Sequence, residues 1–327
     1  MKQTWMRRSA LLALAAALLT GSASALFGGK EETAQAEEGA PAVLDVEITT
    51  YRDIPYQAQF QLGSGEGEMT YAVAEEPRKG TVTVEGARFT YTPEEGVTGS
   101  DSFTYTATDS AGRTSLPATV EVRIEKPKSG VSYSDTAGSP AAAAAQHLAE
   151  AGIFTGAQIG ENYYFEPDRT VSRSEFLALA LETAGREVTD VTMTGFCDDA
   201  SIPAWAKAYA AAGVADGIVQ GKTTADGAAF QGEEAITFNE AATVLNRLLD
   251  LGDVDLDVWF ADREAVPSWA AQAVGNMEAY SVLSASSFGS GTLEDAVTRA
   301  DAAQMLSAAS TLLEGEESEG GLFGWLK

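Results

Sequence analysis

The sequence predicts a chain of two parts: an all-β sandwich, followed by an all-α array of three helix-loop-helix repeats. Between Val43 and Glu125, apolar and polar residues alternate in short runs, which is the period of strands. After residue 131 the apolar spacing becomes helical. The same region also repeats itself about every 64 residues, which indicates repeated structural units.

The first 25 residues have the pattern of a secretory signal peptide. Basic residues precede an apolar run over residues 10–19, and Ala23-Ser24-Ala25 supplies small residues at a cleavage position. The run is about half of the ~20 residues that a membrane-spanning helix needs. We therefore expect residues 1–25 to be removed and residues 26–40 to form a flexible leader, with no cysteine at its start to carry a lipid.

The composition argues against several functional classes. The chain has 48 acidic and 21 basic residues and a formal net charge of -27, which repels nucleic acid and anionic lipid. The single cysteine, Cys197, cannot form an intramolecular disulfide and is predicted to be a small core residue. One histidine, His147, leaves little material for a catalytic triad or a zinc site, so we expect a solvated or helix-capping histidine. No metal or cofactor is predicted.

Residues 41–126 are predicted to form the sandwich, because turn residues separate short alternating strands. Within this part, Gly80-Thr81-Val82, Phe89-Thr90-Tyr91-Thr92-Pro93 and Gly99-Ser100-Asp101-Ser102-Phe103-Thr104-Tyr105 resemble the cadherin-like bacterial immunoglobulin family. The resemblance implies an immunoglobulin-like sandwich that serves as a spacer or an adhesive module on a secreted protein.

Some members of that family have an acidic calcium-binding loop between early strands. The corresponding loop here, residues 63–68, has glutamates but none of the aspartates that suit a cation wanting six to eight oxygens. Asp101 and Asp109 are alternative ligands, but aspartates that cap turns are commoner. We therefore do not expect a calcium site in the sandwich.

The helical part is predicted to contain three units that share three landmarks. Each unit opens with an aromatic-x-Asp motif, continues to a glycine-containing turn and then starts a second helix at a Ser/Thr-x-x-Glu/Asp motif. The openings are Tyr133-Ser134-Asp135, Phe196-Cys197-Asp198 and Phe260-Ala261-Asp262. The predicted segments are a linker at 127–131, units at 132–189, 194–252 and 258–313, and an acidic then apolar tail at 314–327.

The motif at the second helix has a physical explanation. Its hydroxyl residue caps the helix, and the acid three positions later can reach back to form a capping box. The predicted pairs are Ser172 with Glu175, Thr237 with Glu240 and Thr298 with Asp301.

An arginine follows the cap in two of the three units, as Arg173 and Arg299. A cation at a helix N-terminus opposes the helix dipole by roughly 0.3–1 kcal/mol unless an anion lies nearby. Free N–H groups at such a terminus also favour carboxylates or phosphates. The two arginines therefore either form part of an anion site or pair with carboxylates of the protein, and the residues alone leave both open.

Together the landmarks resemble S-layer homology repeats over about 180 residues. The resemblance implies a pseudo-threefold assembly that binds secondary cell-wall polymer, typically with pyruvate ketals, between repeats, or modified peptidoglycan in bacteria with an outer membrane. It also implies that Arg173 and Arg299 pair with the ketal carboxylate, and that Trp205 and Trp269 stack on sugar faces.

The sequence departs from this family pattern at several positions. Phe238 stands in place of the arginine of the second unit, and Pro140 in place of the tryptophan of the first. In the third unit, Ser281 and Ala285 replace the turn glycines. Fewer than three working sites are therefore expected.

One acidic segment has the spacing of a calcium-binding loop. Asp253, Asp255, Asp257 and Glu264 occupy positions 1, 3, 5 and 12 of an EF-hand, but Val258 stands where the sharp turn needs glycine. We expect a solvated linker between units rather than a metal site.

The predicted function is that of a non-catalytic, exported protein held on the cell wall, with the sandwich as spacer or display module. Its predicted partner is wall polymer or peptidoglycan, with no nucleic acid and no membrane span. Two alternatives remain: an adhesin or carbohydrate-binding protein that uses the sandwich, and a wall-active enzyme. Against the enzyme, the two recognised regions occupy nearly all of the chain, and no glycosidase-like carboxylate pair stands out.

Overall fold

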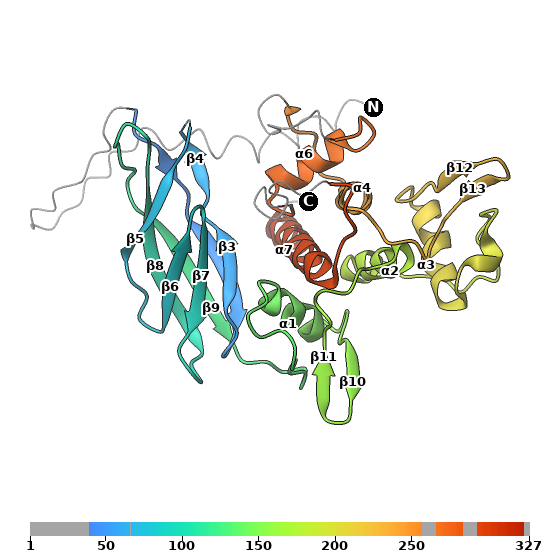
Figure 1. Ribbon diagram of the computed structural model, residues 1–327, viewed down its shortest axis with the longest axis horizontal. Helices are drawn as coiled ribbons and strands as arrows, with labels where there is room; N and C mark the ends of the chain where they lie inside the picture. The colour runs from blue at the N-terminus through green and yellow to red at the C-terminus, as the bar shows by residue number, and fades with distance from the viewer. Residues whose placement is uncertain (1–38, 66, 257–265, 284–292, 324–327) are drawn as a thin grey trace, which may run out of the picture. The chain divides into compact units, whose positions relative to one another are not determined.

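The computed structural model describes residues 39–65, 67–256, 266–283 and 293–323 (Figure 1). The chain divides into two compact units, Met1–Lys126 and Pro127–Lys327, which are treated separately below. Several predicted features lie outside the described residues. These are the signal peptide at 1–25, the leader up to residue 38, the opening Phe260-Ala261-Asp262, and Asp257, Val258, Glu264, Ala285 and residues 324–327.

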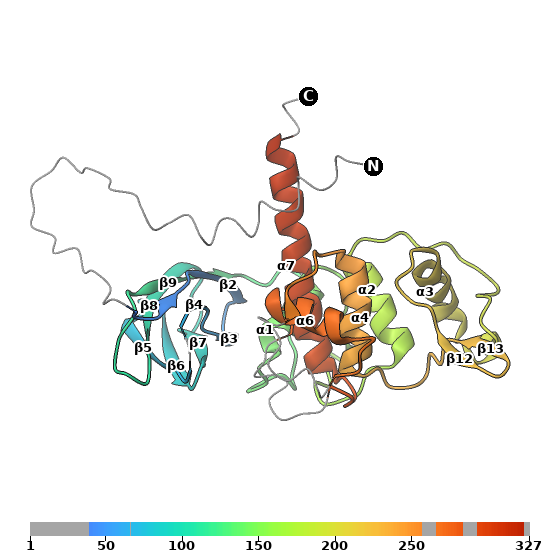
Figure 2. The same ribbon diagram turned by 90° about the horizontal axis from the view of Figure 1, so that it is seen from above.

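The first unit is a β-sandwich, whose two sheets can be followed in Figure 2. One sheet has the strand order β2-β9-β8-β5 and the other β3-β7-β6, while β1 pairs with β4. β2 runs parallel to β9, and the other pairs are antiparallel. The strands are β1 (Ala42–Val43), β2 (Val46–Tyr51), β3 (Tyr56–Gln59), β4 (Leu62–Ser64), β5 (Thr70–Glu75), β6 (Gly80–Glu85), β7 (Arg88–Pro93), β8 (Gly99–Thr108) and β9 (Ala118–Glu125).

The core of the sandwich follows from the two-residue period of its strands. Along β8 and β9 every second side chain is buried, and Phe103 stands opposite Val120 in the register. The ring of Phe60 stacks on that of Tyr105 with centroids 4.5 Å apart. Each such side chain contributes roughly 1.5–3 kcal/mol by leaving water. The β-rich character predicted for this region is confirmed.

The two aspartates considered as calcium ligands hold turns instead. Asp101 is 8% exposed and accepts the backbone N–H groups of Arg78 at 2.9 Å and Lys79 at 2.8 Å, as well as the hydroxyl of Tyr91 at 2.9 Å. Asp109 accepts the N–H groups of Ala111 and Arg113, each at 2.9 Å. Their carboxylate oxygens are therefore engaged by donors of the protein.

Replacing Asp101 by asparagine should destabilise the sandwich by about 1–3 kcal/mol, because an amide NH2 would face donors that now bind a carboxylate oxygen. Burial alone would raise the pKa of Asp101, but these donors hold it below its ordinary value. The stabilisation is therefore present above the unfolded-state pKa and is lost as the pH falls through the folded-state pKa. Calorimetric melting of Asp101→Asn against Glu47→Gln, an exposed strand residue, checks this. Equal melting curves would contradict it.

The second unit contains six main helices and two hairpins among its described residues. Its helices are α1 (Ala142–Glu150), α2 (Arg173–Thr183), α3 (Ala204–Ala215), α4 (Phe238–Leu249), α6 (Ala271–Ala279) and α7 (Arg299–Phe323), with a short 3-10 turn, η1 (Asp199–Ser201). The hairpins are β10 (Ala157–Ile159) with β11 (Asn162–Tyr164), and β12 (Lys222–Thr224) with β13 (Gly227–Ala229).

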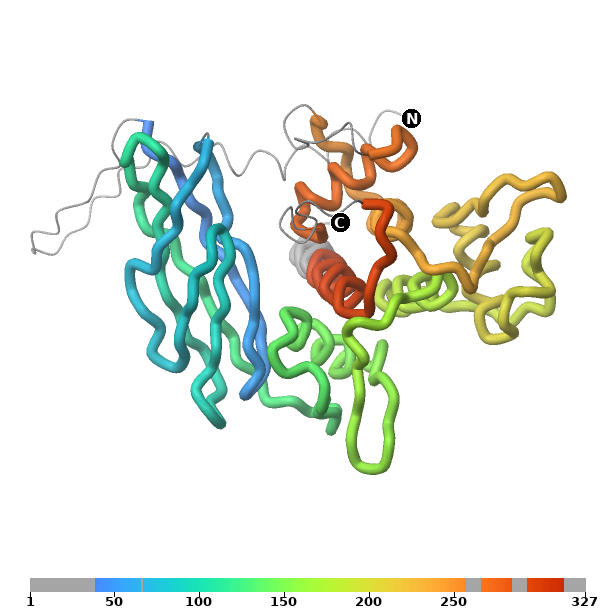
Figure 3. Tube along the Cα trace, in the orientation of Figure 1, coloured from blue at the N-terminus to red at the C-terminus, as the bar shows by residue number. Residues whose placement is uncertain are grey.

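The prediction of an all-α region is thus wrong in one respect. The hairpins follow α1 and α3 and can be traced in Figure 3. Their strands have only three residues each, too few for a clear alternating pattern. Glycines with positive φ lie at their turns, Gly160 at 65° and Gly227 at 125°.

Three backbone segments close a ring at the centre of this unit. The N–H of Val171 donates to the carbonyl of Val297 at 2.9 Å, that of Val297 to Ile236 at 2.9 Å, and that of Ile236 back to Val171 at 3.0 Å. All three side chains are at most 2% exposed. We call these three residues the ring. Each stands two residues before a helix, so α2, α4 and α7 all begin beside it, and we call them the central helices.

The other three helices, α1, α3 and α6, pack on the central helices in a cyclic order. α3 packs on α2, α6 packs on α4, and α1 packs on α7 (Figure 1). Alanines with at most 1% exposure, Ala145, Ala206 and Ala210, let these helices approach closely. The first helix of each predicted unit therefore lies on the second helix of the preceding unit, and the first unit closes on the last.

Within the described residues, no helix has the length and apolar character needed to cross a bilayer. α7 continues to Phe323, beyond the predicted end of the third unit at residue 313. The helix therefore runs into the segment that the sequence divides into an acidic and an apolar tail.

The prediction that Cys197 is a core residue is wrong, because its side chain is exposed. Phe196 turns inward at 7% exposure, so the next residue points outward, and the N–H of Cys197 pairs with the carbonyl of Ala228 at 2.9 Å. His147 lies half-buried in the last turn of α1, rather than fully solvated.

Candidate functional site

The N-termini of the central helices are closed by capping boxes. Ser172 accepts the N–H of Glu175 while Glu175 accepts the N–H of Ser172, and Thr237 and Glu240 form the same reciprocal pair. At the start of α7 the N–H of Thr298 donates to Asp301 at 3.0 Å, and the N–H of Asp301 donates to Thr298 at 3.2 Å. The ring thus brings three capped helix starts together.

These helix starts do not offer the free N–H groups that the sequence suggested for anion binding. The N–H of Arg173 donates to Glu234 and that of Ser174 to Gly232, each at 2.9 Å. At α7, the N–H of Arg299 donates to Arg169 at 2.8 Å. Neighbouring loops therefore use these backbone donors, and Arg173 and Arg299 supply the side-chain cations of these two helix starts.

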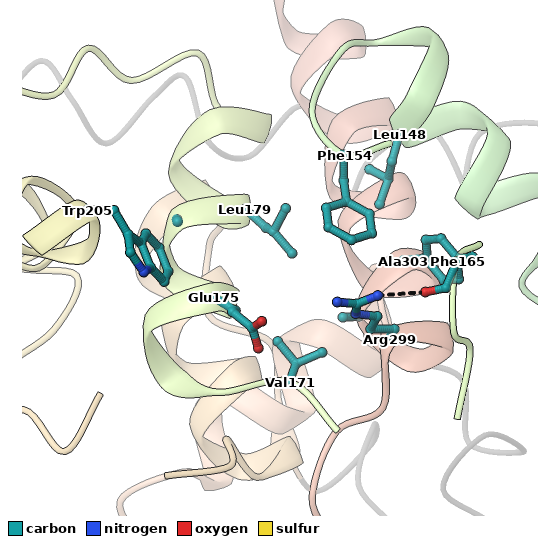
Figure 4. Close-up of a pocket in the computed structure, with 11 residues that line it drawn as sticks. Leu148, Phe154, Phe165, Val171, Glu175, Leu179, Trp205, Arg299 and Ala303 are labelled. Carbon is teal, nitrogen blue, oxygen red and sulfur yellow. Dashed lines mark hydrogen bonds between the residues drawn. The ribbon is translucent and has the colours of Figure 1, made fainter. Parts of the chain in front are cut away.

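Arg299 lines a cavity of about 260 Å³, shown in Figure 4. Its guanidinium lies over the ring of Phe154 at 5.0 Å, and its Nη1 donates to the carbonyl of Phe165 and to Glu166 Oε2, each at 2.9 Å. Trp205 and Glu175 line the same cavity. The other lining residues are apolar: Leu148, Phe154, Phe165, Val171, Ala178, Leu179, Ala302 and Ala303.

A second, more polar hollow of about 430 Å³ shares Glu175 and Trp205 with the first. Its other lining residues are Arg169, Thr170, Ser172, Pro203, Glu233 and Ala235. Trp205 is 51% exposed although it is a large aromatic side chain. The apolar cavity, the exposed ring of Trp205 and the polar hollow adjoin one another. Together they suit a saccharide that carries an apolar or carboxylate substituent. We call the two hollows with Arg299 the Arg299 site.

Arg173 makes the same kinds of contact as Arg299, with a backbone carbonyl and with a carboxylate, but its carboxylate partner comes from a different position. Its Nε donates to the carbonyl of Phe230 at 3.0 Å, and its Nη1 pairs with Glu240 Oε1 at 2.9 Å. Both side chains are largely buried, at 11% and 14% exposure. Burial would raise the pKa of Glu240, but Arg173, the Thr237 N–H and Lys222 hold it below its ordinary value. We call this environment the Arg173 site.

The cyclic packing decides which tryptophan belongs with which arginine. Trp205 lies in the first turn of α3 and lines the cavity with Arg299. Trp269, 58% exposed, lies just before α6, which packs on α4, the helix that carries Glu240. By the same order we assign Trp269 to Arg173, an inference from the packing of α6 on α4. Each arginine and its tryptophan therefore come from different predicted units.

Two of the departures from the repeat pattern, Phe238 and Pro140, fall at the same place in the cyclic packing order. Phe238 begins α4, and its N–H donates to the carbonyl of Asp295, just before α7. The helix that packs on α7 is α1, which Pro140 precedes. The position that lacks the motif arginine therefore also lacks the tryptophan. The two substitutions affect one potential site rather than two.

The sequence patterns did not predict several residues of the Arg299 site. Phe154, Phe165, Glu166 and Arg169 come from the loops around the first hairpin, whose existence was not predicted. A usable signal was present: Phe165-Glu166 and Phe230-Gln231 lie at matching places in the first two units. Among the residues that the structure describes, no group of His, Cys, Asp or Glu is arranged to hold a metal ion.

Replacing Glu240 by glutamine should destabilise the second unit by roughly 3 kcal/mol, because a largely buried Arg173 loses its partner. The folded-state pKa of Glu240 is depressed, so its contribution is present above the unfolded-state pKa and is lost as the pH falls through the folded value. Chemical denaturation at pH 7 measures it, with Glu234→Gln, an exposed neighbour, as the matched control. A Glu240→Gln loss no larger than that of the control would contradict the assignment.

Comparison with solved structures gave distant likenesses. A putative alpha-galactosidase from Bacteroides fragilis is 16% identical over 28% of this chain and 19% of its own, with a TM-score of 0.22. A Photobacterium 2,6-sialyltransferase is 10% identical over 26% of this chain and 18% of its own, with a TM-score of 0.22. The fibronectin(III)-like modules of Clostridium thermocellum CbhA are 12% identical over 27% of this chain and 98% of their own, with a TM-score of 0.18. The chain thus spans less than a fifth of the first two.

No curated protein matches the chain. Two families do match parts of it: the bacterial Ig domain at residues 32–123 and the S-layer homology domain at residues 132–177. The second match contains α1, the first hairpin and the start of α2 with Arg173. The chain therefore carries a bacterial Ig domain followed by an S-layer homology domain, a type of domain that suggests anchoring to the cell wall.

Proposed function

We propose that this protein is exported by its N-terminal signal peptide and held non-covalently on the cell wall by three S-layer homology units. The match at residues 132–177 covers most of the first unit, residues 132–189. The ring, the capping boxes and the cyclic helix packing support extending the assignment to residues 194–252 and 258–313. In this view the Ig domain is a spacer or display module, and the protein has no catalytic role.

The observation that carries the proposal is the convergence of three units at the Arg299 site. The first unit supplies Phe154 and Phe165, the second Trp205 and the third Arg299. An exposed indole beside a largely buried cation can stack on a sugar ring while the guanidinium binds its carboxylate. A pyruvylated wall polymer offers both groups, and the apolar cavity wall suits the methyl group of a ketal.

Two working sites are part of the proposal. Trp205 lines the cavity of Arg299, and the cyclic packing order supports assigning Trp269 to Arg173. The third position has Phe238 and Pro140, which provide neither a cation nor an indole. That position therefore has a structural role only.

The tryptophans provide the sharpest test, because they are exposed and their loss leaves the core intact. Trp205→Ala and Trp269→Ala should each weaken co-sedimentation with isolated wall sacculi roughly tenfold, and the double substitution should abolish it, as for aromatic residues that dominate an interface. Met193→Ala, which removes another apolar side chain of 72% exposure, is the control. Unchanged pelleting of the double variant would rule out these two sites.

A further inference from the structure

The two arginine sites carry different residues at one equivalent position, where the backbone conformation is the same. Glu166 follows Phe165 and has φ 56°, and Gln231 follows Phe230 and has φ 55°. Asp135 accepts the N–H groups of Phe165 and Glu166, at 2.9 and 2.7 Å. The corresponding Asp198 accepts those of Phe230 and Gln231, both at 2.8 Å. The two positions are therefore equivalent, and one carries a carboxylate where the other carries an amide.

This difference decides which partner each arginine takes. Arg299 Nη1 pairs with Glu166 Oε2 at 2.9 Å, and the capping residue Glu175 is left to Arg169 at 2.8 Å. At the other site, where the amide carries no charge, Arg173 pairs with the capping residue Glu240 at 2.9 Å. At the Arg299 site, the carboxylate of Glu166 thus takes the role of arginine partner that the capping acid Glu240 has at the Arg173 site.

The Arg299–Glu166 and Arg173–Glu240 ion pairs also differ in how easily they can separate. The Arg299 and Glu166 side chains are 11% and 49% exposed, and the second cation near Glu166 is Arg169, at 3.8 Å and itself 48% exposed. Glu240 is 14% exposed and also binds Lys222 at 3.1 Å. A carboxylate that is half in water gains little from an ion pair, and it can return to solvent at small cost. A buried acid that loses its arginine is left uncompensated. Only Glu166 is therefore free to leave.

The guanidinium of Arg299 stays in place when Glu166 leaves. It keeps its bond to the carbonyl of Phe165 at 2.9 Å and its position over the ring of Phe154. The cavity wall around it is apolar, which strengthens any charge-assisted hydrogen bond made there. Glu166 lines neither hollow, but it holds Nη1 of Arg299, so a ligand carboxylate that binds Nη1 would take the place of Glu166 Oε2.

The geometry points to Glu166 as an internal competitor that must be displaced from Arg299 before a carboxylate-bearing saccharide can bind. This inference rests on the proposed function and deepens it: the Arg299 site takes the carboxylate of the polymer, and Glu166 sets the affinity and excludes weaker anions. Arg173, held by Glu240, is a structural cation, so the Arg173 site contacts the polymer through its uncharged groups.

The test is an NMR titration of the whole chain, observing the indole N–H signals of Trp205 and Trp269 after assignment by Trp→Phe substitution. The probe is a methyl hexoside bearing a 4,6-linked pyruvate ketal, with its methyl ester as the uncharged counterpart. Glu166→Gln should bind the acid about 3- to 10-fold more tightly at Trp205 and bind the ester unchanged, as expected when an exposed competing ion pair is lost. At Trp269 the acid and the ester should bind alike in both proteins.

Glu161→Gln is the matched control, since it removes the same charge from an exposed position five residues away, in the turn between β10 and β11. Equal tightening by both substitutions would assign the effect to overall charge and overturn the inference. Weaker acid binding by Glu166→Gln would make Glu166 a part of the site rather than a competitor, which also overturns it.

Wall binding separates a failure of this inference from a failure of the proposed function. If neither protein binds the ketal acid although the unaltered chain pellets with sacculi, anchoring stands and the role of Glu166 is wrong. If the unaltered chain also fails to pellet with sacculi that retain their polymer, the anchoring proposal itself fails.

Discussion

The helical unit depends on the ring of backbone hydrogen bonds between Val171, Ile236 and Val297. A buried N–H or carbonyl without a partner costs about 1–3 kcal/mol, and no single segment of the ring can satisfy its own groups. Each segment needs one neighbour as donor and another as acceptor, so three segments close on themselves. The ring also fixes where α2, α4 and α7 begin, which places their caps and arginines around one centre.

A second consequence is that each site is shared between units. Because α3 packs on α2 and α1 packs on α7, the side chains that surround Arg299 come from helices and loops far apart in the chain. A sequence comparison unit by unit assigns Phe238 to one repeat and Pro140 to another, and so it counts two damaged sites. The cyclic order assigns both to one position, so the proposal keeps two sites, and this depends on the closed arrangement and not on any single repeat.

Local patterns predicted the elements, whereas long-range packing decided the partners. The two-residue period of β8 and the Ser172 and Glu175 capping motif are visible in the sequence because they involve neighbours along the chain. The short hairpins have too few residues for a period, and the exposure of Cys197 depends on which side of its strand-like segment meets the core. Sequence left open whether the arginines pair with protein carboxylates. In the structure both do, and the choice between Glu166 and Glu240 as partner depends on exposure and distance.

Because the chain is strongly acidic, binding of an anionic polymer depends on the local surroundings of Arg299. A protein of formal net charge -27 repels an anionic polymer at long range, but in physiological salt this repulsion is screened beyond about 8 Å. Attraction must then come from contacts inside that distance, where a guanidinium against an apolar wall is desolvated and its bonds to a carboxylate are strong. An arginine without an internal partner would leave a buried, uncompensated cation. Glu166 removes that cost in the free protein, and its exposure keeps the arginine available to a ligand.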